Sequence, residues 1–415
     1  MSEPHRSRAF GIDPSVLVVL AGVSAALHVG KLPPAIPVLR DALGITLVQA
    51  GFLLSLVQLA GMTLGLLVGV MADGVGLKRT LIAGLALLSA ASAMGAAAMD
   101  ASSLLAWRAV EGAGFLLASL PGPALIRRLV EPARLHARLG LWGTYMPLGT
   151  ALALLLGPLA IAAWGWPAWW GSLSALSALM ALALAWALPA DVRAAHPQPM
   201  QAQPASTSPT DTERWWQRLA QTLLHRGPWL VALAFAVYSA QWLAVIGFLP
   251  SIYAQAGVAA AQAGVLTALA AAVNMLGNLM SGRLLQRGFA PRQTMTLGFV
   301  AMALGALLAF AELGQGAAWR YLGVILFSTI GGLIPGTLFS TAVRLAPGER
   351  TVSSTVGFMQ QLSALGQFTG PPVVAWVASR VGGWQWTWAV TGALALLGLL
   401  LTQVIHAELH RRSVH

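Results

Sequence analysis

The sequence predicts an all-α membrane protein with twelve transmembrane helices in two pseudo-symmetric six-helix bundles. Composition excludes an ordinary soluble domain, because 57% of the 415 residues are hydrophobic and only 9% are charged, whereas soluble domains carry about 25% charged residues. Apolar runs of roughly 20 residues, the length that spans a bilayer, recur along the whole chain. A polar segment near the middle separates two halves that share features in the same order, which predicts a duplicated six-helix unit.

Each apolar run is expected to be a helix, because a strand edge or a bare loop cannot satisfy its backbone polar groups in lipid. The first run follows Arg6 and Arg8 in the manner of a signal peptide. It is long enough to span and further runs follow, so we expect it to remain as the first helix. In chain order the runs cover 15–39, 47–71, 79–99, 102–125, 139–161, 167–189, 228–252, 258–282, 292–313, 318–342, 353–378 and 384–406.

The polar segment predicts the domain organisation. It contains AAHPQPMQAQPASTSPTDTER, whose Pro, Ser, Gln and Thr content is typical of a flexible linker. The stretch WWQRLAQTLLHR that follows fits a short helix at the membrane surface and a plain linker helix equally well. We therefore expect an N-terminal bundle at 1–189, a cytoplasmic linker at 190–227 and a C-terminal bundle at 228–415. Repeated halves place the substrate site at their interface near the membrane midplane.

Basic residues predict the orientation, because Lys and Arg accumulate in cytoplasmic loops. With a cytoplasmic N-terminus, only Arg40, Arg320 and Arg380 fall on the outer side, and only Lys31 and Arg108 lie at membrane depth; the rest of the 24 Lys and Arg are cytoplasmic. The net charge of +11 therefore needs no nucleic-acid partner. The chain has no cysteine, which excludes disulfides and thiolate metal sites. We expect a multi-pass protein of a bacterial-type cytoplasmic (inner) membrane with both termini cytoplasmic.

The loop after the second run reads GVMADGVGLKRT. Its residues Gly69, Asp73, Gly76, Lys78 and Arg79 resemble the pattern that the major facilitator superfamily carries at this place. The glycines permit close helix contact and a tight turn, and Asp73 can pair with basic residues or with a neighbouring helix terminus. The resemblance covers essentially the whole chain. It implies that superfamily's fold and a conformational latch at these five residues on the cytoplasmic side; a simple positive-inside turn is the alternative.

The fourth run carries WRAVEGAGF, which resembles the superfamily's Arg-x-x-x-Gly-x-Gly element at Arg108, Gly112 and Gly114. Glu111 stands where the family often has Gln, and its spacing of three residues puts it on the same helix face as Arg108. A charge at this depth is costly and usually faces a cavity or a partner. A self-paired structural bridge between the two side chains is the alternative.

His28 and Lys31, in the stretch ALHVGKLPPAIP, also lie inside a span and share a face. In the superfamily that the chain resembles, the first and fourth helices line the central cavity. We therefore expect His28, Lys31, Arg108 and Glu111 to meet around one water-filled space. Two alternatives stay open: Lys31 could extend to the outer headgroups, and His28 could make a hydrogen bond between helices.

Other candidate substrate-binding residues are neutral polar side chains within or beside the spans. Hydrogen bonds between helices account for most such residues in membrane bundles, and that is the alternative for each of them. The candidates are Tyr145, Tyr238, Gln241, Asn274 and Gln360.

Together these features predict a secondary active transporter that moves a small solute, anionic or acid-bearing, by alternating access and with proton coupling. In the expected site, the two positive charges of Lys31 and Arg108 face a single negative charge, that of Glu111. Arg108 would hold a planar acid through two parallel hydrogen bonds, and Glu111 or His28 would carry the coupled proton. The run LPPAIPVLR after Lys31 loosely resembles the cyanate/nitroimidazole branch of the superfamily.

The alternative within transport is a proton-coupled multidrug efflux antiporter, because Gly149, Gly157 and Pro158 in the fifth run resemble the Gly-Pro element of drug/proton antiporters. An enzyme is not expected, since the sequence has no H-E-x-x-H metal spacing and no set of nucleophile, base and acid. A receptor or a scaffold without transport activity is another option, but it would not need charged residues such as Arg108 and Glu111 at membrane depth. We expect no cofactor or metal, and a monomer whose partners are the solute, protons and the lipid bilayer.

Overall fold

The computed structural model describes residues 13–65, 76–131, 134, 138, 141–189, 215–314, 316–348 and 351–414. Within these residues the regular elements are all helical. They are α1 (Pro14–Gly30), η1 (Pro33–Ala35), α2 (Ile36–Leu43), α3 (Leu47–Ser55), η2 (Leu56–Gln58), α5 (Leu77–Ala96), α6 (Ala101–Ser119), α7 (Gly122–Leu129), α9 (Tyr145–Ala187), α10 (Trp215–Leu224), α11 (Arg226–Gln255), α12 (Ala260–Gln286), α13 (Pro291–Phe310), α14 (Ala317–Gly331), α15 (Leu333–Leu345), α16 (Val352–Val381) and α17 (Thr387–Val414).

The predicted all-α membrane fold is confirmed. In the described part of the chain, 10 helical stretches are long and apolar enough to cross a membrane. One of them, α9, is 43 residues long and turns at Gly165 (φ 78°, ψ 164°), so it crosses twice, as the separate runs 139–161 and 167–189 predict. The run at 353–378 lies in α16, which has 30 residues. In their described parts, which leave out 66–71 and 139–140, the twelve predicted runs therefore all correspond to helices.

Proline interrupts the first span. A proline lacks the backbone N–H that continues a helix and its ring clashes with the preceding turn. Accordingly α1 ends at Gly30, a single 3₁₀ turn follows at Pro33–Ala35, and α2 begins at Ile36. Lys31 lies at this interruption, as the residue that caps α1, and its backbone N–H still donates to Leu27 O. The break therefore places Lys31 at the C-terminal cap of α1, just before the 3₁₀ turn.

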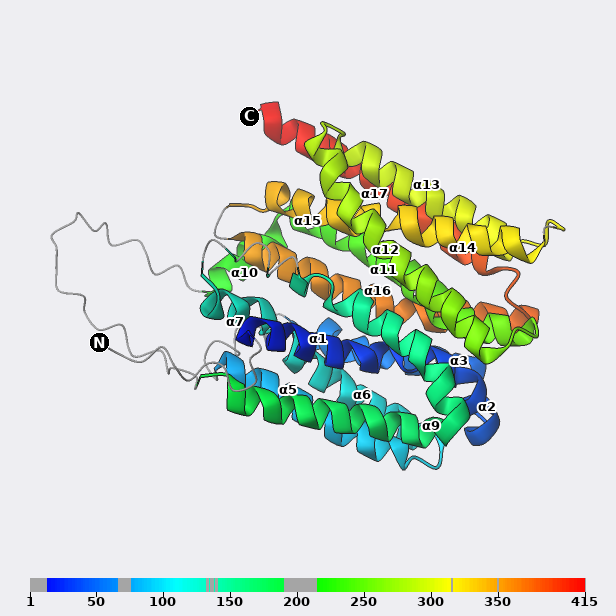
Figure 1. Cartoon of the computed structure of the whole chain (residues 1–415). Helices are drawn as coiled ribbons and strands as arrows, with labels where there is room; N and C mark the ends of the chain where they lie inside the picture. The colour runs from blue at the N-terminus through cyan, green and yellow to red at the C-terminus, as the bar shows by residue number, and fades with distance from the viewer. Residues whose placement is uncertain are drawn as a thin grey trace, which may run out of the picture.

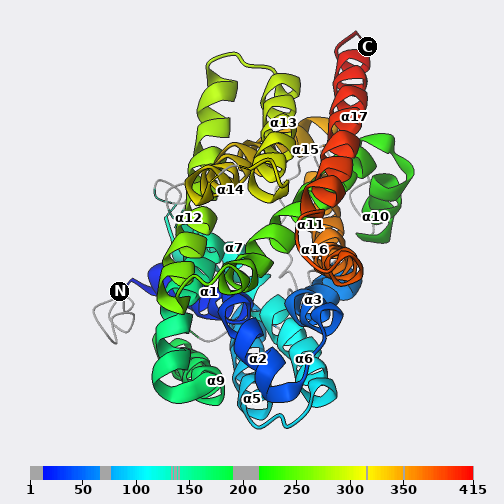
Figure 2. The same cartoon turned by 90° about the vertical axis from the view of Figure 1, so that its right-hand side faces the viewer.

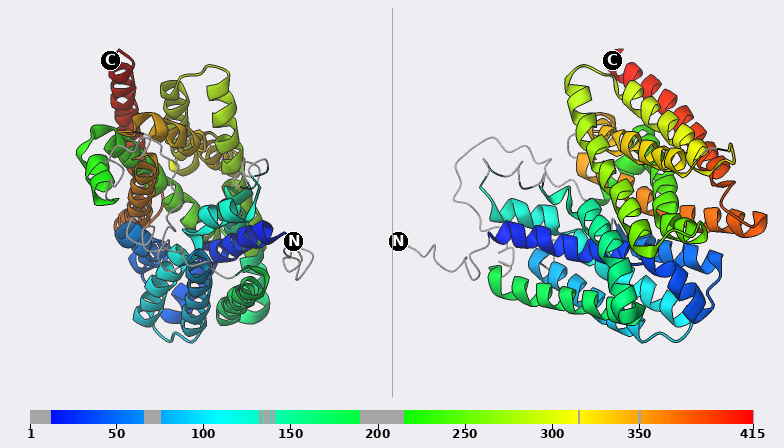
Figure 3. Two further views of the ribbon diagram at one scale, coloured as in Figure 1. Left: turned by 90° about the vertical axis from the view of Figure 1, so that its left-hand side faces the viewer. Right: turned by 45° about the vertical axis from the view of Figure 1, so that its right-hand side comes forward.

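Two groups of helices form the molecule: α1 to α9, the first half, and α11 to α17, the second half (Figure 1). The halves approach each other at the end that carries α2, here called the α2 end. They diverge toward the end where α1 begins and α17 finishes, here called the terminal end. Figures 2 and 3 show the same separation from the sides. The domain boundaries at 190–227 stay a prediction, because 190–214 lie outside the described residues.

Apolar packing joins the two halves at the α2 end. One buried cluster contains side chains of α2, α3 and α9 together with Phe248 of α11 and Trp384, whose rings lie 4.8 Å apart. Small residues permit close approach: a Cβ on Gly51 would lie 2.9 Å from Pro372 Cα, and a Cβ on Gly264 would lie 2.9 Å from Leu154 O. A polar bond between η2 and α16 adds to this contact, with Gln58 Nε2 donating to Gln367 Oε1 at 2.9 Å.

Candidate functional site

Four ionisable side chains from the first and fourth spans meet inside the first half. His28 and Lys31 come from the end of α1, and Arg108 and Glu111 come from α6; each is at most 1% exposed. Lys31 Nζ lies 2.5 Å from Glu111 Oε1, and Arg108 Nη1 lies 2.6 Å from Glu111 Oε2. The two oxygens of one carboxylate therefore accept from two different cations. We call these four residues the charge cluster.

Helix caps and glycines position α6 in this cluster. Asp100 caps its start by accepting from Ser103 N at 2.8 Å. Further along, a Cβ on Gly112 would lie 2.7 Å from Val57 O, and a Cβ on Gly114 would lie 2.7 Å from Leu88 N. Because no side chain fits at those two places, α6 packs closely against its neighbours and carries Arg108 into the interior. This explains the Arg-x-x-x-Gly-x-Gly spacing in physical terms.

Three further residues complete the cluster, and sequence reasoning missed all of them. Lys31 Nζ donates to Ser92 Oγ of α5 at 2.8 Å and lies 4.6 Å from the ring centre of Trp170. His28 Nε2 lies 2.8 Å from Ser177 Oγ. Ser92, Trp170 and Ser177 belong to the third and sixth spans, and a lone Ser or Trp in an apolar run gives no signal that could have identified them.

The geometry assigns the tautomer of His28. Lys31 Nζ lies 3.3 Å from His28 Nδ1, and an ammonium group can only donate. Nδ1 is therefore the acceptor, and the ring proton is on Nε2, which donates to Ser177 Oγ. In this arrangement His28 is neutral, so the charge cluster carries Lys31 and Arg108 against Glu111, with one positive charge in excess.

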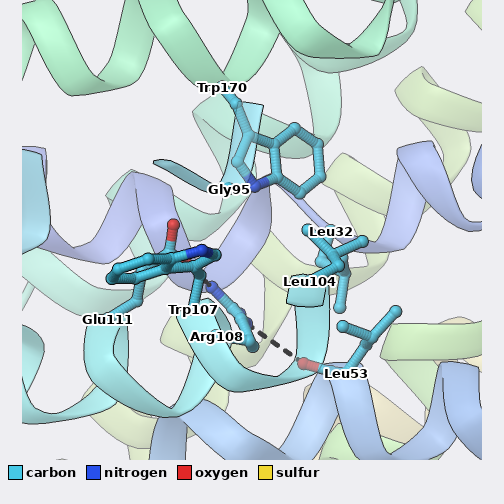
Figure 4. Close-up of a pocket in the computed structure, with 8 residues that line it drawn as sticks. All are labelled: Leu32, Leu53, Gly95, Leu104, Trp107, Arg108, Glu111 and Trp170. Atoms are coloured by element: carbon cyan, nitrogen blue, oxygen red, sulfur yellow. Dashed lines mark hydrogen bonds and ion pairs between the residues drawn. The ribbon is translucent and has the colours of Figure 1, made fainter. Parts of the chain in front are cut away.

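Arg108 ties three helices together. Its Nε donates to Leu53 O of α3 at 3.0 Å, and its Nη1 donates to His28 O of α1 at 2.6 Å. Figure 4 shows the side chain reaching from α6 toward Leu53. Its remaining nitrogen, Nη2, is buried and has no hydrogen-bond partner among the residues that the structure describes. The pocket around it, which Trp107 and Trp170 help to line, has no room for a water molecule. The four residues therefore meet as expected, but the expectation that they surround a water-filled space is wrong for this conformation, in which their described surroundings are dry.

The neutral candidates gather elsewhere. In the second half, Asn274 Nδ2 of α12 donates to Tyr238 OH at 2.9 Å and to Ser328 O at 2.8 Å. Gln241 is buried on α11; its Nε2 donates to Val237 O at 3.0 Å, and its Oε1 has no partner. Tyr238, Asn274 and Ser328 form a neutral network between α11, α12 and α14, and Gln241 bonds only within α11.

Two candidates lie outside both groups. Tyr145, at the start of α9, packs against Trp142 with ring centres 4.5 Å apart. Gln360 is exposed on α16, whereas its neighbour Gln361 donates to Met62 O of the first half at 2.7 Å. The contact between halves therefore belongs to the residue one position further along the chain.

The predicted latch is only partly described. Gly69 and Asp73 lie outside the described residues. Gly76 precedes α5 with φ 108°, a backbone conformation that favours glycine. Lys78 Nζ donates to Ala185 O at 2.9 Å and to Leu188 O at 2.6 Å, where a cation is favourable at the C-terminus of α9. The latch role of these residues and of Arg79 stays a prediction.

Twelve spans in two halves, with ion pairs inside one of them, define a polytopic helical membrane protein. The chain matches the family model described as Major Facilitator Superfamily over residues 17–366. It belongs to that family, whose members are membrane transporters and not enzymes, so the predicted family and transporter class are confirmed.

Relatives in sequence support the same assignment. The chain is 28% identical over 381 residues to the 2-nitroimidazole transporter of Escherichia coli (strain K12), and this match covers 89% of this chain and 88% of the relative. It is 28% identical over 162 residues to the Methylenomycin A resistance protein of Bacillus subtilis (strain 168), which covers 38% of this chain and 34% of the relative.

Solved structures share the fold. The bacterial homologue of the human lysosomal transporter Spinster, in its inward-facing and unoccupied conformation, matches with a TM-score of 0.78 at 14% identity over 99% of both chains. The inward-facing and occupied conformation matches with a TM-score of 0.78 at 14% identity over 98% of both chains. At this level of identity the likeness concerns the fold alone.

Proposed function

We propose that the chain is a secondary active transporter for a small solute with an anionic or acid-bearing group, driven by protons, in a bacterial-type cytoplasmic membrane. One observation carries the proposal: Lys31 and Arg108 face Glu111 alone, deep inside a span region and at most 1% exposed. An uncompensated charge in such a place costs several kcal/mol. An anionic group is therefore the favoured occupant whenever the cluster opens.

Arg108 supports a planar shape for that group. Its buried Nη2 has no partner, and a buried donor left unsatisfied costs about 1–3 kcal/mol. A guanidinium recognises a planar pair of oxygens through parallel hydrogen bonds, and the indole rings of Trp107 and Trp170 line the same pocket. The relative named 2-nitroimidazole transporter supports this class, because that solute is a small flat ring whose nitro oxygens accept hydrogen bonds.

Alternating access needs a route to the cluster, and α3 offers one. Arg108 holds α3 through Leu53 O, and α3 packs against α16 of the second half. Movement of the halves that shifts α3 would break this bond and open the pocket toward the interface. The halves are packed together at the α2 end, which we assign to the outer side because Lys and Arg accumulate at the opposite end.

Glu111 supports coupling to protons. It accepts from both cations of the cluster, so protonation would remove the only negative charge that balances Lys31 and Arg108. Both cations would then favour an anionic solute more strongly. In this scheme one proton and one anionic group occupy the cluster together, which predicts symport.

Transport by purified protein in proteoliposomes tests the proposal. A thermal-shift screen against small planar acids and nitroheterocycles first identifies a solute, and its uptake is then measured with and without a pH gradient. Lys31→Gln should lower uptake at least tenfold, because it removes the excess positive charge. Arg320→Gln, which removes one positive charge at an exposed position of α14, is the matched control and should transport normally. Unchanged uptake by Lys31→Gln would contradict the proposal.

A proton-coupled multidrug efflux antiporter is the second candidate. The Methylenomycin A resistance protein and the Gly157-Pro158 element of α9 favour it. For a neutral or cationic drug, Lys31→Gln should leave efflux largely intact, so the same variant separates the two functions.

The orientation can be measured directly because the chain has no cysteine. Gln255→Cys and Gln286→Cys are exposed positions before and at the end of α12, at the α2 end and the terminal end. A membrane-impermeant maleimide added to intact cells should label Gln255→Cys and leave Gln286→Cys unlabelled. The reverse pattern would overturn the proposed cytoplasmic termini.

A further inference from the structure

A groove at the terminal end is separate from the charge cluster. It has a volume of about 350 Å³, within the roughly 300–1,000 Å³ of typical ligand sites. Its walls come from the end of α10, the start of α11 and the last turns of α17. Leu224, Arg226, Trp229, Val404, Glu408 and Arg411 are among the residues that line it.

Hydrogen bonds fix the wall that α10 provides. Thr222 Oγ1 lies 2.6 Å from Ser354 Oγ of α16, and Trp229 Nε1 of α11 donates to Leu223 O at 2.8 Å. Figure 2 shows α10 beside α11 and α16. The α10 wall of the groove is therefore held to α11 and α16 by hydrogen bonds.

Two apolar stripes lead along the spans into this groove. On α11, Trp229 and Leu233 are both exposed, four residues apart. On α17, Leu396, Leu400 and Val404 are exposed at intervals of four residues, which places them on one helix face. Both helices are long and apolar enough to span a membrane and they pack against each other, so their exposed stripes face the acyl chains.

The charges at the head of the groove are mainly positive. Glu408 is paired with Arg411 at 3.8 Å and with Arg412 at 3.3 Å, so two cations offset one carboxylate. Arg226, on the opposite wall, is exposed and makes no hydrogen bond or ion pair with another described residue. An anion in the groove would therefore meet Arg226 on one side and Arg411 on the other.

We propose that this groove binds an anionic phospholipid of the adjacent leaflet. The phosphate and glycerol headgroup lies between Arg226 and Arg411, and the acyl chains follow the stripes on α11 and α17. Leu224, which is 82% exposed, enters the boundary between headgroups and acyl chains, as apolar residues of interfacial helices do. Basic pockets between membrane helices are suited to such headgroups. The lipid thereby connects α10 to the second half.

Native mass spectrometry of the full-length protein in neutral detergent tests this site. Phosphatidylglycerol and phosphatidylcholine are added in turn, and retained lipid is counted. The protein should retain phosphatidylglycerol in preference. The double variant Arg226→Gln/Arg411→Gln should lose about 30-fold of that preference, because each basic residue at an anionic surface contributes about fivefold. Arg283→Gln/Arg344→Gln, two exposed arginines outside the groove, is the matched control.

Two measurements keep the test decisive if the double variant folds poorly. In the unmodified protein, the preference should fall as salt rises, because screening weakens contacts between exposed charges. Inorganic phosphate at millimolar concentration should not displace the lipid, since it lacks acyl chains. Equal retention of both lipids, an equal loss in the control variant, or complete displacement by phosphate would each overturn the proposal.

Discussion

The first half buries charged groups at the centre of its helices, whereas the second half buries neutral ones. Lys31, Arg108 and Glu111 form ion pairs across α1 and α6. In the second half, Tyr238 and Asn274 join α11 and α12 through neutral hydrogen bonds. The two halves thus share an architecture. They differ in whether these buried polar groups are charged or neutral.

This difference has a physical consequence. A dry charge cluster depends on its balance, because removing one partner of a buried pair leaves an uncompensated charge. A neutral network loses only the bonds that are removed, and such bonds in membrane bundles contribute about 0.6 kcal/mol on average. Under the proposed function, a proton or an anionic solute would act on the first half, while the second half would offer a surface of constant polarity.

The largest expected effect comes from breaking the balance in the first half. Glu111→Gln raises the excess from one positive charge to two, and we expect it to lower the free energy of unfolding by about 3–5 kcal/mol. Lys31→Met should cost clearly less, because it leaves Arg108 and Glu111 as a neutral pair. Unfolding in mixed detergent and SDS micelles measures both.

The informative result is which of these two variants, Glu111→Gln or Lys31→Met, loses more free energy of unfolding. A cluster held by hydrogen bonds alone would make Lys31→Met at least as costly as Glu111→Gln. Lys31→Met removes the bonds to His28, Ser92 and Glu111, whereas Glu111→Gln keeps an acceptor oxygen for Arg108. The double variant Lys31→Met/Glu111→Gln restores the original excess of one positive charge and should be milder than Glu111→Gln alone. If it is instead the least stable of the three, the account by charge balance is wrong.

Sequence reasoning predicted the fold because the constraint is strong and local. A bilayer demands apolar runs of fixed length, and Pro33 and Gly165 mark where two of those runs end or turn. The runs could not reveal how tightly the halves pack at the α2 end. That contact depends on Gly51 meeting Pro372, which are far apart in the chain.

The site was predicted less completely, for a different reason. Charges stand out in an apolar run, so His28, Lys31, Arg108 and Glu111 were identifiable. Ser92 and Ser177 are common residues in membrane helices, and only the fold brings them to Lys31 and His28. The candidate Gln360 illustrates a rotational limit, because one position along a helix turns a side chain by about 100°, and Gln361 makes the contact instead.

A smaller effect is expected from the neutral network. Asn274→Leu removes the bonds to Tyr238 OH and to Ser328 O, and we expect a loss of about 1–2 kcal/mol. Tyr238→Phe removes only one partner and serves as the comparison. Proton-driven uptake should keep its pH dependence in both variants. A pH dependence abolished by Asn274→Leu would show that the second half is not the neutral partner.

A partly exposed pair at the start of α1 sharpens the contrast with the buried one. Asp13 caps α1 through Ser15 N at 2.8 Å and accepts from Arg138 Nη2 at 2.8 Å. Its hydrogen bonds with Ser15 hold the pKa of Asp13 below the usual 3.8. A lowered folded-state pKa means that the stabilisation is present above about pH 4 and is lost as the pH falls through the folded-state pKa.

Asp13→Ala should therefore cost about 1 kcal/mol, the usual worth of a helix cap, in unfolding measured at pH 7. The same comparison repeated at pH 3 should show a smaller difference. Asp13→Asn keeps a capping oxygen without the charge and should lose less at pH 7. An effect as large as that of Glu111→Gln would contradict the distinction between exposed and buried charge.

The smallest expected effect concerns the bond that joins the two halves. Gln58 Nε2 donates to Gln367 Oε1 at 2.9 Å, and Gln58 is 6% exposed. A double-mutant cycle with Gln58→Leu and Gln367→Leu should give a coupling of about 0.6 kcal/mol.

Because the bond crosses between halves that must move, its loss should also change the population of the state closed at the α2 end. Spin labels at Gln255→Cys and Asp41→Cys, one on each half, report that population as a distance distribution. An unchanged distribution would mean that apolar packing alone holds the α2 end together.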